Sequence, residues 1–153
     1  MLQIRDLMAD DLADIATWTY DGPWSVYDSH GALDPSLGYW AVVDTDDGRL
    51  WGFACLGEDA RVPGLVEADG VLDVGVGTRP DLVGQGRGAE FAGVVLDLAE
   101  TRGALRLRAA VQDWNERSLR PLAGLGFART CTHPVGPVTY AVLERPVRPV
   151  RPG

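Results

Sequence analysis

The sequence contains no lysine, and its fourteen basic residues are all arginine. It has only two cysteines, Cys55 and Cys131, and two histidines, so neither a disulfide framework nor a clustered zinc site is expected. No apolar run approaches the roughly 20 residues of a membrane-spanning helix, and the first residues lack the apolar region of a signal peptide. We therefore expect a cytoplasmic protein without a metal and without a membrane partner.

The composition is that of one globular domain. The chain has 153 residues, of which 46% are hydrophobic and 24% charged, which is enough to bury a core without covalent cross-links. We expect a single domain over residues 1–145, followed by a flexible tail over residues 146–153 that is rich in proline and arginine.

The charge is unevenly distributed along the chain. The net charge is −8, which argues against a nucleic-acid partner. Residues 1–73 carry 3 arginines and 15 acidic residues, whereas residues 74–153 carry 11 arginines and 7 acidic residues. This pattern predicts that one half of the chain suits a cationic ligand and the other an anion.

Hydrophobic periodicity predicts an α/β (α+β) fold with a mostly antiparallel mixed sheet of six to seven strands and about four helices. One helix follows a cap at Asp10 or Asp11, a second begins at Ala89 and ends near Gly103, and a short one follows Asn115. The strand-like runs cover residues 2–5, 39–43, 50–55, 71–76, 105–111, 127–133 and 138–144.

Pro121 decides where the helix after Asn115 begins. A proline inside a helix clashes with the carbonyl four residues before it. We favour a helix capped by Ser118, because Pro121 then lies in the first turn, where proline is tolerated.

Aromatic residues gather between Trp18 and Tyr27. Such residues either pack against the core or line a substrate pocket, and Tyr20, Trp24 and Tyr27 are the candidates for the second role.

A glycine-rich turn covers residues 83–89, between a predicted strand and a predicted helix. Glycines let successive backbone N–H groups converge, and the start of a helix adds partial positive charge, so the turn suits a phosphate or pyrophosphate. The mid-chain position argues against a dinucleotide-binding fold, and the absence of lysine excludes a Walker motif.

Two blocks of the sequence carry a specific resemblance. The first runs from Leu72 through Arg79-Pro80-Asp81 to Gly84-Gln85-Gly86-Arg87-Gly88, and the second runs from Asn115-Glu-Arg-Ser118 to Gly126-Phe127. They resemble the R/Q-x-x-G-x-G/A and N-x-x-A/S…G-F motifs of the GNAT superfamily of acyl-CoA-dependent N-acetyltransferases. The order of elements is similar over residues 2–144, and the chain looks like a bacterial branch of that superfamily.

The resemblance implies that acetyl-CoA enters between the strands at residues 71–78 and 104–111, which the family's fold splays apart. It implies that pantetheine runs beside β-strand residues and that backbone amides hold the pyrophosphate. The implied cofactor-binding residues are Val76, Gly77, Thr78, Val83, Gly84, Gln85, Gly86, Arg87, Gly88, Ala89, Asn115 and Ser118.

The chain departs from the family pattern at two positions. Val83 stands where the family usually has Arg or Gln, which should weaken phosphate binding without abolishing it. Leu122 stands where a tyrosine often protonates the departing thiolate, so Tyr140 or water would have to supply that proton.

The deprotonation of an amine requires a base, and the resemblance points first to Asp73. Glu67, in the loop before it, is the second candidate, and either residue can equally be a surface or hydrogen-bonded acid. His133 lies on one of the last two predicted strands and is more typical of a structural residue. Cys55 and Cys131 are expected to be small hydrophobic residues rather than nucleophiles.

The resulting hypothesis is an N-acetyltransferase that moves an acetyl group from acetyl-CoA to an amine by direct attack. The acidic half favours a cationic small molecule or a peptide N-terminus as acceptor. The alternative is a non-catalytic acyl-CoA-binding or sensing domain, and a generic phosphate-ligand protein is kept in case the fold assignment fails. The sequence leaves open whether the protein forms a homodimer.

Overall fold

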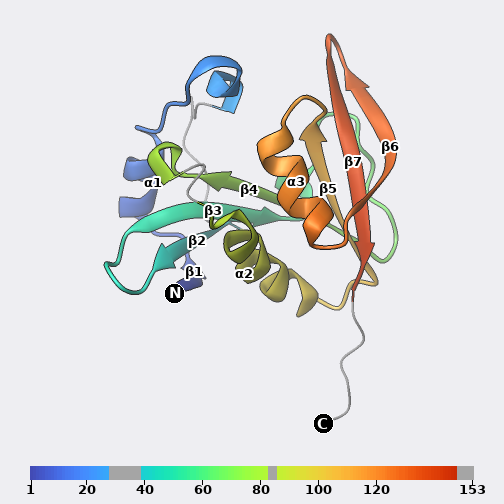
Figure 1. Ribbon diagram of the computed structural model, residues 1–153. Helices are drawn as coiled ribbons and strands as arrows, with labels where there is room; N and C mark the ends of the chain where they lie inside the picture. Colours follow the sequence, from blue (N-terminus) through green and yellow to red (C-terminus); the bar gives the residue numbers. More distant parts are fainter. Residues whose placement is uncertain (28–38, 83–85, 148–153) are drawn as a thin grey trace.

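The structure is a computed structural model that describes residues 1–27, 39–82 and 86–147. Seven strands form one sheet in the order β1-β2-β3-β4-β5-β7-β6, which confirms the expected mixed sheet (Figure 1). The strands are β1 (Leu2–Asp6), β2 (Tyr39–Asp44), β3 (Leu50–Leu56), β4 (Val71–Thr78), β5 (Arg106–Gln112), β6 (Ala128–Val135) and β7 (Val138–Pro146).

The described residues contain three α-helices and three short 3₁₀ helices, where about four helices were expected. They are α1 (Ala9–Ile15), α2 (Gly88–Glu100) and α3 (Glu116–Gly124), with η1 (Gly22–Tyr27), η3 (Glu58–Ala60) and η4 (Pro80–Leu82). Within the described part of the chain, no helix has the length and apolar character needed to cross a membrane.

The start of α1 corrects the expected cap. Met8, rather than Asp10 or Asp11, occupies the N-cap position. Asp11 lies one turn into the helix and reaches back to accept a hydrogen bond from the Met8 N–H at 2.8 Å. Its carboxylate also binds the Arg5 guanidinium at 2.6 and 2.9 Å. This tertiary ion pair, which local sequence does not reveal, places the acid inside the helix.

The start of α3 also differs from the expected register. The helix begins at Glu116, so Pro121 lies inside it and Ser118 is not the cap. The Asn115 carbonyl accepts hydrogen bonds from the N–H groups of Ser118 at 3.2 Å and Leu119 at 3.0 Å, which fixes the first turn. Burial of Leu119 in the core holds this register although Pro121 has no N–H to donate within the helix.

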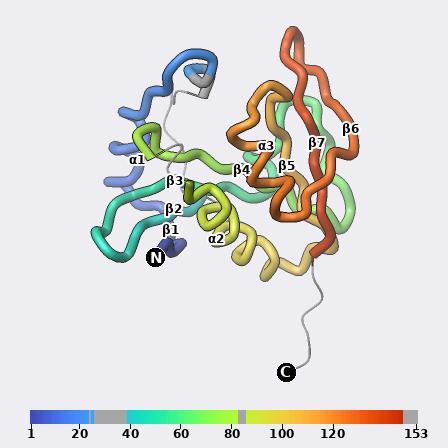
Figure 2. Tube along the Cα trace, in the orientation of Figure 1, coloured from blue at the N-terminus to red at the C-terminus, as the bar shows by residue number. Residues whose placement is uncertain are grey.

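Two apolar clusters cover the two faces of the sheet. Successive residues of β2 divide between them, since Val42 belongs to the cluster under α2 and α3, and Ala41 belongs to the cluster that includes Ile15 and Trp18. Helices α2 and α3 lie next to each other on the first face, as the trace in Figure 2 also shows.

The end of the domain lies slightly later than expected. Pro146 pairs with Arg106 as the last residue of β7, and the Val147 N–H donates to the Leu105 carbonyl at 2.8 Å. Residues 146 and 147 therefore belong to the folded domain and not to a tail. Residues 148–153 lie outside the described part of the chain.

Candidate active site

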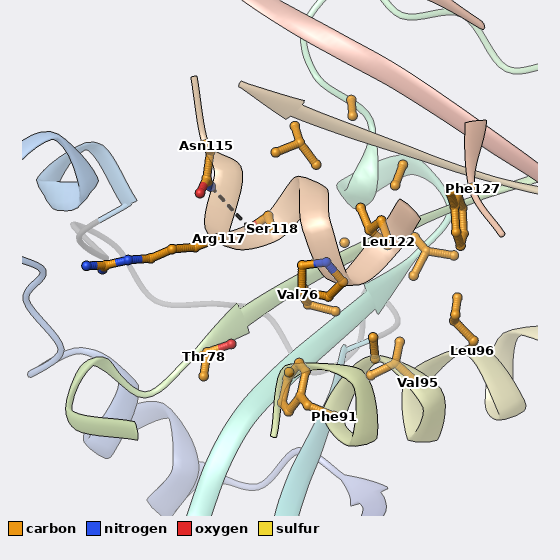
Figure 3. Close-up of a pocket in the computed structure, with 18 of the residues that line it drawn as sticks. Val76, Thr78, Phe91, Val95, Leu96, Asn115, Arg117, Ser118, Leu122 and Phe127 are labelled. Carbon is orange, nitrogen blue, oxygen red and sulfur yellow. Dashed lines mark hydrogen bonds between the residues drawn. The ribbon is translucent and has the colours of Figure 1, made fainter. Parts of the chain in front are cut away.

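The central feature of the sheet is the short pairing of β4 with β5. The two parallel strands pair at only three positions, Val71 with Arg106, Leu72 with Leu107 and Asp73 with Arg108. Beyond Asp73 a cavity of about 220 Å³ lies between them, lined by both strands and by α2 and α3 (Figure 3). The separation of these strands, which the resemblance implied, is thus present in the structure.

The backbone of β4 offers hydrogen-bonding groups to this cavity. The Asp73 carbonyl accepts from the Gly57 N–H at 2.8 Å, and the Arg79 N–H donates to the Trp51 carbonyl at 2.7 Å, so odd-numbered residues bond to the β3 side. Because hydrogen-bonded pairs alternate along an antiparallel ladder, even-numbered residues face the β5 side, and beyond the last pair, Asp73 with Arg108, Val76 and Thr78 direct their backbone groups towards the cavity. The Val76 side chain is 49% exposed there, which suits contact with an extended ligand.

A second cavity of about 620 Å³ adjoins the first at the start of α2. Gly86 and Gly88 line it, and Gly86 has φ +78°, a conformation that favours glycine. The amides of Gly88, Ala89 and Glu90 occupy the first turn of α2, where a helix has no acceptor of its own. An open, glycine-lined helix start suits a pyrophosphate. Val83, Gly84 and Gln85 lie outside the described residues.

The Arg87 side chain is held by two carboxylates beside that helix start. Its guanidinium binds Glu90 at 2.8 Å and Asp44 at 2.9 Å and lies over the Trp51 ring at 4.6 Å. Its hydrogen bonds with Glu90 and Asp44 raise the pKa of Arg87. The Asp46 N–H and the Arg87 guanidinium lower the pKa of Asp44 to about 2. Arg87 therefore fastens the start of α2 to β2, with its charge balanced by Asp44 and Glu90 at the edge of the larger cavity.

Asn115 and Ser118 lie where the two cavities meet. Asn115 is buried, and its side-chain amide donates to the Ser118 hydroxyl at 3.1 Å. Arg117 extends from the same turn and lines both cavities, and Arg120 lines the larger one (Figure 3). These two arginines were not among the predicted site residues, although they follow Asn115 closely in the sequence.

Asp73 lies at the closed end of the strand pair and not in the cavity. It is 2% exposed, and its carboxylate accepts from Arg108 at 2.6 and 3.0 Å and from Arg61 at 3.2 Å. Arg108 also donates to the Val66 carbonyl at 2.8 Å. This geometry favours a structural ion pair over a catalytic base. Glu67 is exposed in the preceding loop, and neither cavity includes it.

Tyr140 and Leu122 both line the smaller cavity. Tyr140 lies on β7 opposite Gln112 of β5, and Leu122 lies on α3. His133 is bonded through Nε2 to the Pro63 carbonyl at 2.8 Å, consistent with a structural residue. Tyr140 is therefore the phenol that the fold brings to the cavity.

Sequence reasoning did not single out Asp59. A side chain at Gly75 of β4 would meet Cys55 Sγ at 2.9 Å and the Ala60 Cα at 3.5 Å, so η3 packs against β4 beside the smaller cavity. Burial and nearby Asp59 raise the pKa of Tyr39, and they also raise the pKa of Cys55 to about 12. No motif marks Asp59, since only the tertiary packing of η3 brings it to β4.

Tyr20 is the predicted aromatic residue that the structure places at the site. Its hydroxyl donates to the Thr78 carbonyl at 2.5 Å, and its side chain lines the larger cavity. The backbone of Trp24 and Tyr27 belongs to η1, and their side chains lie outside the described part of the structure.

Comparison with known proteins identifies the family of the chain. Residues 2–127 match the Acetyltransferase (GNAT) family. The chain belongs to the GNAT family. It is a GNAT-type N-acetyltransferase that uses acetyl-CoA. A search of the curated proteins gave no significant match.

Solved structures share this fold at low sequence identity. A GNAT-family acetyltransferase from Bacillus anthracis has a TM-score of 0.73 and 16% identity, with 95% of this chain and 94% of that chain covered. YncA from Salmonella typhimurium, a putative acetyltransferase solved with its cofactor acetyl-CoA, has a TM-score of 0.67 and 18% identity, with 100% and 98% covered. The aminoglycoside acetyltransferase AAC(6')-Ib, solved with coenzyme A and kanamycin, has a TM-score of 0.71 and 14% identity, with 95% of each chain covered.

The residues of the cleft fit acetyl-CoA. The larger cavity has a helix start for the pyrophosphate, the β4 edge has N–H and C=O groups for the pantetheine amides, and Asn115 lies between them. Among residues 1–27, 39–82 and 86–147 there is no group of three or more His, Cys, Asp or Glu that could hold a metal ion.

Proposed function

We propose that this acetyltransferase acts on a cationic amine, a small molecule or a peptide N-terminus, which attacks acetyl-CoA directly. The observation that carries the proposal is the packing of η3 against Gly75 of β4 beside the cleft, which places Asp59 of η3 near the Tyr39 phenol. Carboxylates and aromatic faces together suit an ammonium group. Tyr39 also contacts Phe53, whose ring centroid lies 6.3 Å away.

The uneven charge along the sequence supports this proposal less than expected. Several acids of the first half are neutralised inside the fold, since Asp14, Asp44 and Asp73 bind arginines from the second half. Asp59 is different, because it is exposed and its partner is a phenol. The local pair at η3, and not the charge of the whole half, is therefore the basis for a cationic acceptor.

The chemistry follows from groups around the cleft. The ammonium group of the acceptor first loses a proton, which passes through water to Asp59 and frees the nitrogen lone pair. The amine nitrogen then attacks the thioester carbon, and the Val76 N–H would donate to the carbonyl oxygen as it becomes negative. The C–S bond then breaks, and the thiolate of coenzyme A takes a proton from Tyr140 or from water. The nitrogen loses its second proton to water as the amide forms, which balances the proton given to the thiolate.

Asp59 replaces Asp73 as our first candidate for the base. Both oxygens of Asp73 accept from guanidinium groups, which leaves it poorly placed to take a proton. Glu67 stays a lesser candidate because the loop that carries it precedes the closed end of β4.

A thiol-release assay with a panel of amines tests the acceptor. We expect polyamines, kanamycin and unblocked peptides to be acetylated faster than anionic amines, with apparent affinity falling as salt screens the charge over about 8 Å. Asp59→Asn should lower kcat/KM for cationic acceptors at least tenfold. Asp69→Asn, an exposed acid in the loop before β4, is the matched control and should have little effect. Equal turnover of cationic and anionic amines would contradict the proposal.

A further inference from the structure

The smaller cavity has two chemically different ends. Thr78, Asn115 and Arg117 lie towards its mouth, whereas Val95, Leu96 and Phe127 lie at the other end (Figure 3). The residues of the second end are apolar and almost fully buried, with exposed fractions of 1%, 3% and 5%. A ligand that enters from the start of α2 therefore passes from a polar mouth into a closed apolar end.

The apolar end lies deeper than the cofactor arm needs to reach. From Gly88 at the start of α2 to Leu96 the helix rises about 12 Å. The pantetheine end is expected at Val76 and Asn115, yet the cavity continues past them to Val74 and Ala109 on the two strands. Val74 lies two residues, or about 7 Å, further along β4 than Val76.

Small side chains shape the walls of this deep end. Ala109 on β5 faces the cavity, and Leu122 stands on α3 where the family often has a tyrosine. A leucine occupies less length than a phenol, and it has no hydroxyl that would need a polar partner in an apolar space. Both features leave apolar room where a ring would otherwise extend.

We infer that the deep end of this cavity binds the acyl group of the donor and takes chains longer than acetyl, such as propionyl and butyryl. The occupant is the acyl chain of a short-chain acyl-CoA, because it is the apolar group that the thioester places next to the pantetheine end. The inference rests on the acyl-CoA site of the proposed function and does not depend on the identity of the acceptor.

Calorimetric titration of the full chain with acetyl-, propionyl- and butyryl-CoA tests the inference without any acceptor. Each methylene moved from water into an apolar site raises affinity roughly fourfold. We therefore expect butyryl-CoA to bind about tenfold or more tightly than acetyl-CoA. Equal or weaker binding of butyryl-CoA would overturn the inference while leaving an acetyltransferase with a cationic acceptor intact. Conversely, a failed acceptor panel would leave this result unchanged.

Larger side chains in the deep end should remove the preference for butyryl-CoA over acetyl-CoA. In Leu122→Phe the ratio of the acetyl-CoA and butyryl-CoA dissociation constants should fall to near one. Ala109→Val, which adds two methyl groups on β5, is a second variant in case the first does not fold. Leu98→Phe makes the same change on α2 outside the cavity and should keep the wild-type ratio. A ratio unchanged in both filled variants would place the acyl chain elsewhere and overturn the inference.

Discussion

The two ends of the β4–β5 pair differ in almost every property. At the closed end the strands are hydrogen-bonded, and Asp73 is clamped between Arg108 and Arg61 in a buried ion pair. At the open end Val76 is half exposed, and a cavity replaces the partner strand. The strands separate directly after the residues of the clamp. The comparison indicates that the ion pair fixes the point at which the cleft begins.

Removal of the clamp should have the largest effect on stability. Asp73→Asn leaves two arginines facing an uncharged amide in a buried site, which should lower the free energy of unfolding by about 3 kcal/mol. Urea denaturation followed by circular dichroism measures this loss.

The exposed pair of Glu116 with Arg120 is the matched control for that experiment. Its nitrogen and oxygen lie 3.8 Å apart, and both side chains are largely exposed. Glu116→Gln should change the free energy of unfolding by about 0.5 kcal/mol or less. A loss of activity in Asp73→Asn with unchanged stability would instead return Asp73 to the role of base.

A change at the open end should affect ligand binding. Acetyl-CoA at about 100 times its dissociation constant should raise the free energy of unfolding by about 2.7 kcal/mol. Gly88→Val should abolish most of this gain. A Cβ added at this position would lie 3.4 Å from Pro121, so the methyl groups of valine would extend into the larger cavity. Thermal shifts measured with and without acetyl-CoA give the difference.

Gly93→Val provides the control, since Gly93 lies on the same helix and a Cβ added there would meet no neighbouring atom within 4 Å outside the helix's own backbone. It should keep the ligand-induced shift, and the intrinsic stability of the helix should rise slightly because valine is a better helix former than glycine. If Gly88→Val keeps the shift as well, the start of α2 does not hold the phosphates.

The hydroxyl of Tyr140, at the open end, is the candidate proton donor to the departing thiolate. Tyr140→Phe keeps the ring on the cavity wall and removes only the hydroxyl. If Tyr140 protonates the thiolate, kcat should fall at least tenfold, or about 1.4 kcal/mol, with unchanged binding of acetyl-CoA. Steady-state kinetics and titration together give this answer, and an unchanged kcat would assign the proton to water.

The smallest expected effect concerns the ion pair that fastens the open end. The pKa of Asp44 lies at about 2 against an ordinary value of 3.8, so the carboxylate stabilises the fold above pH 3.8 and loses this effect as the pH falls towards 2. Asp44→Asn should therefore be less stable than the wild type at neutral pH, and the two proteins should converge between about pH 4 and 2. If the difference in free energy of unfolding between the wild type and Asp44→Asn stays constant over this pH range, the ion pair of Asp44 does not stabilise the fold.

Local patterns were sufficient to predict most of the fold. Each expected strand is present, and most continue by one or two residues beyond the predicted run, as at Leu56, Thr78 and Pro146. Alternating side chains mark such strands clearly, because one face packs on the core. The motif around Asn115 predicted cofactor-binding residues, and the structure places Asn115 and Ser118 where the two cavities meet.

The differences between the expected and observed surroundings of these residues have a common physical cause, which is that distant partners determine the position of a residue. Asp73 is an acidic residue at a plausible motif position, but Arg108, 35 residues away, donates hydrogen bonds to both of its carboxylate oxygens. Asp59 lies in a three-residue 3₁₀ helix without a motif, and only packing against Gly75 brings it beside the cleft. Pro121 lies inside α3, because burial of Leu119 fixes the register of the helix although proline is unfavourable in a helix interior.

The two cysteines differ in a way that is useful for experiments. Cys55 is buried with a pKa of about 12, so it stays protonated and unreactive towards maleimides at neutral pH, whereas Cys131 is exposed on the edge strand β6. A fluorophore can therefore be attached at Cys131 in the otherwise unaltered protein. Strand β6 pairs with β7, which carries Tyr140, so the dye would report on the cleft wall through one hydrogen-bonded strand.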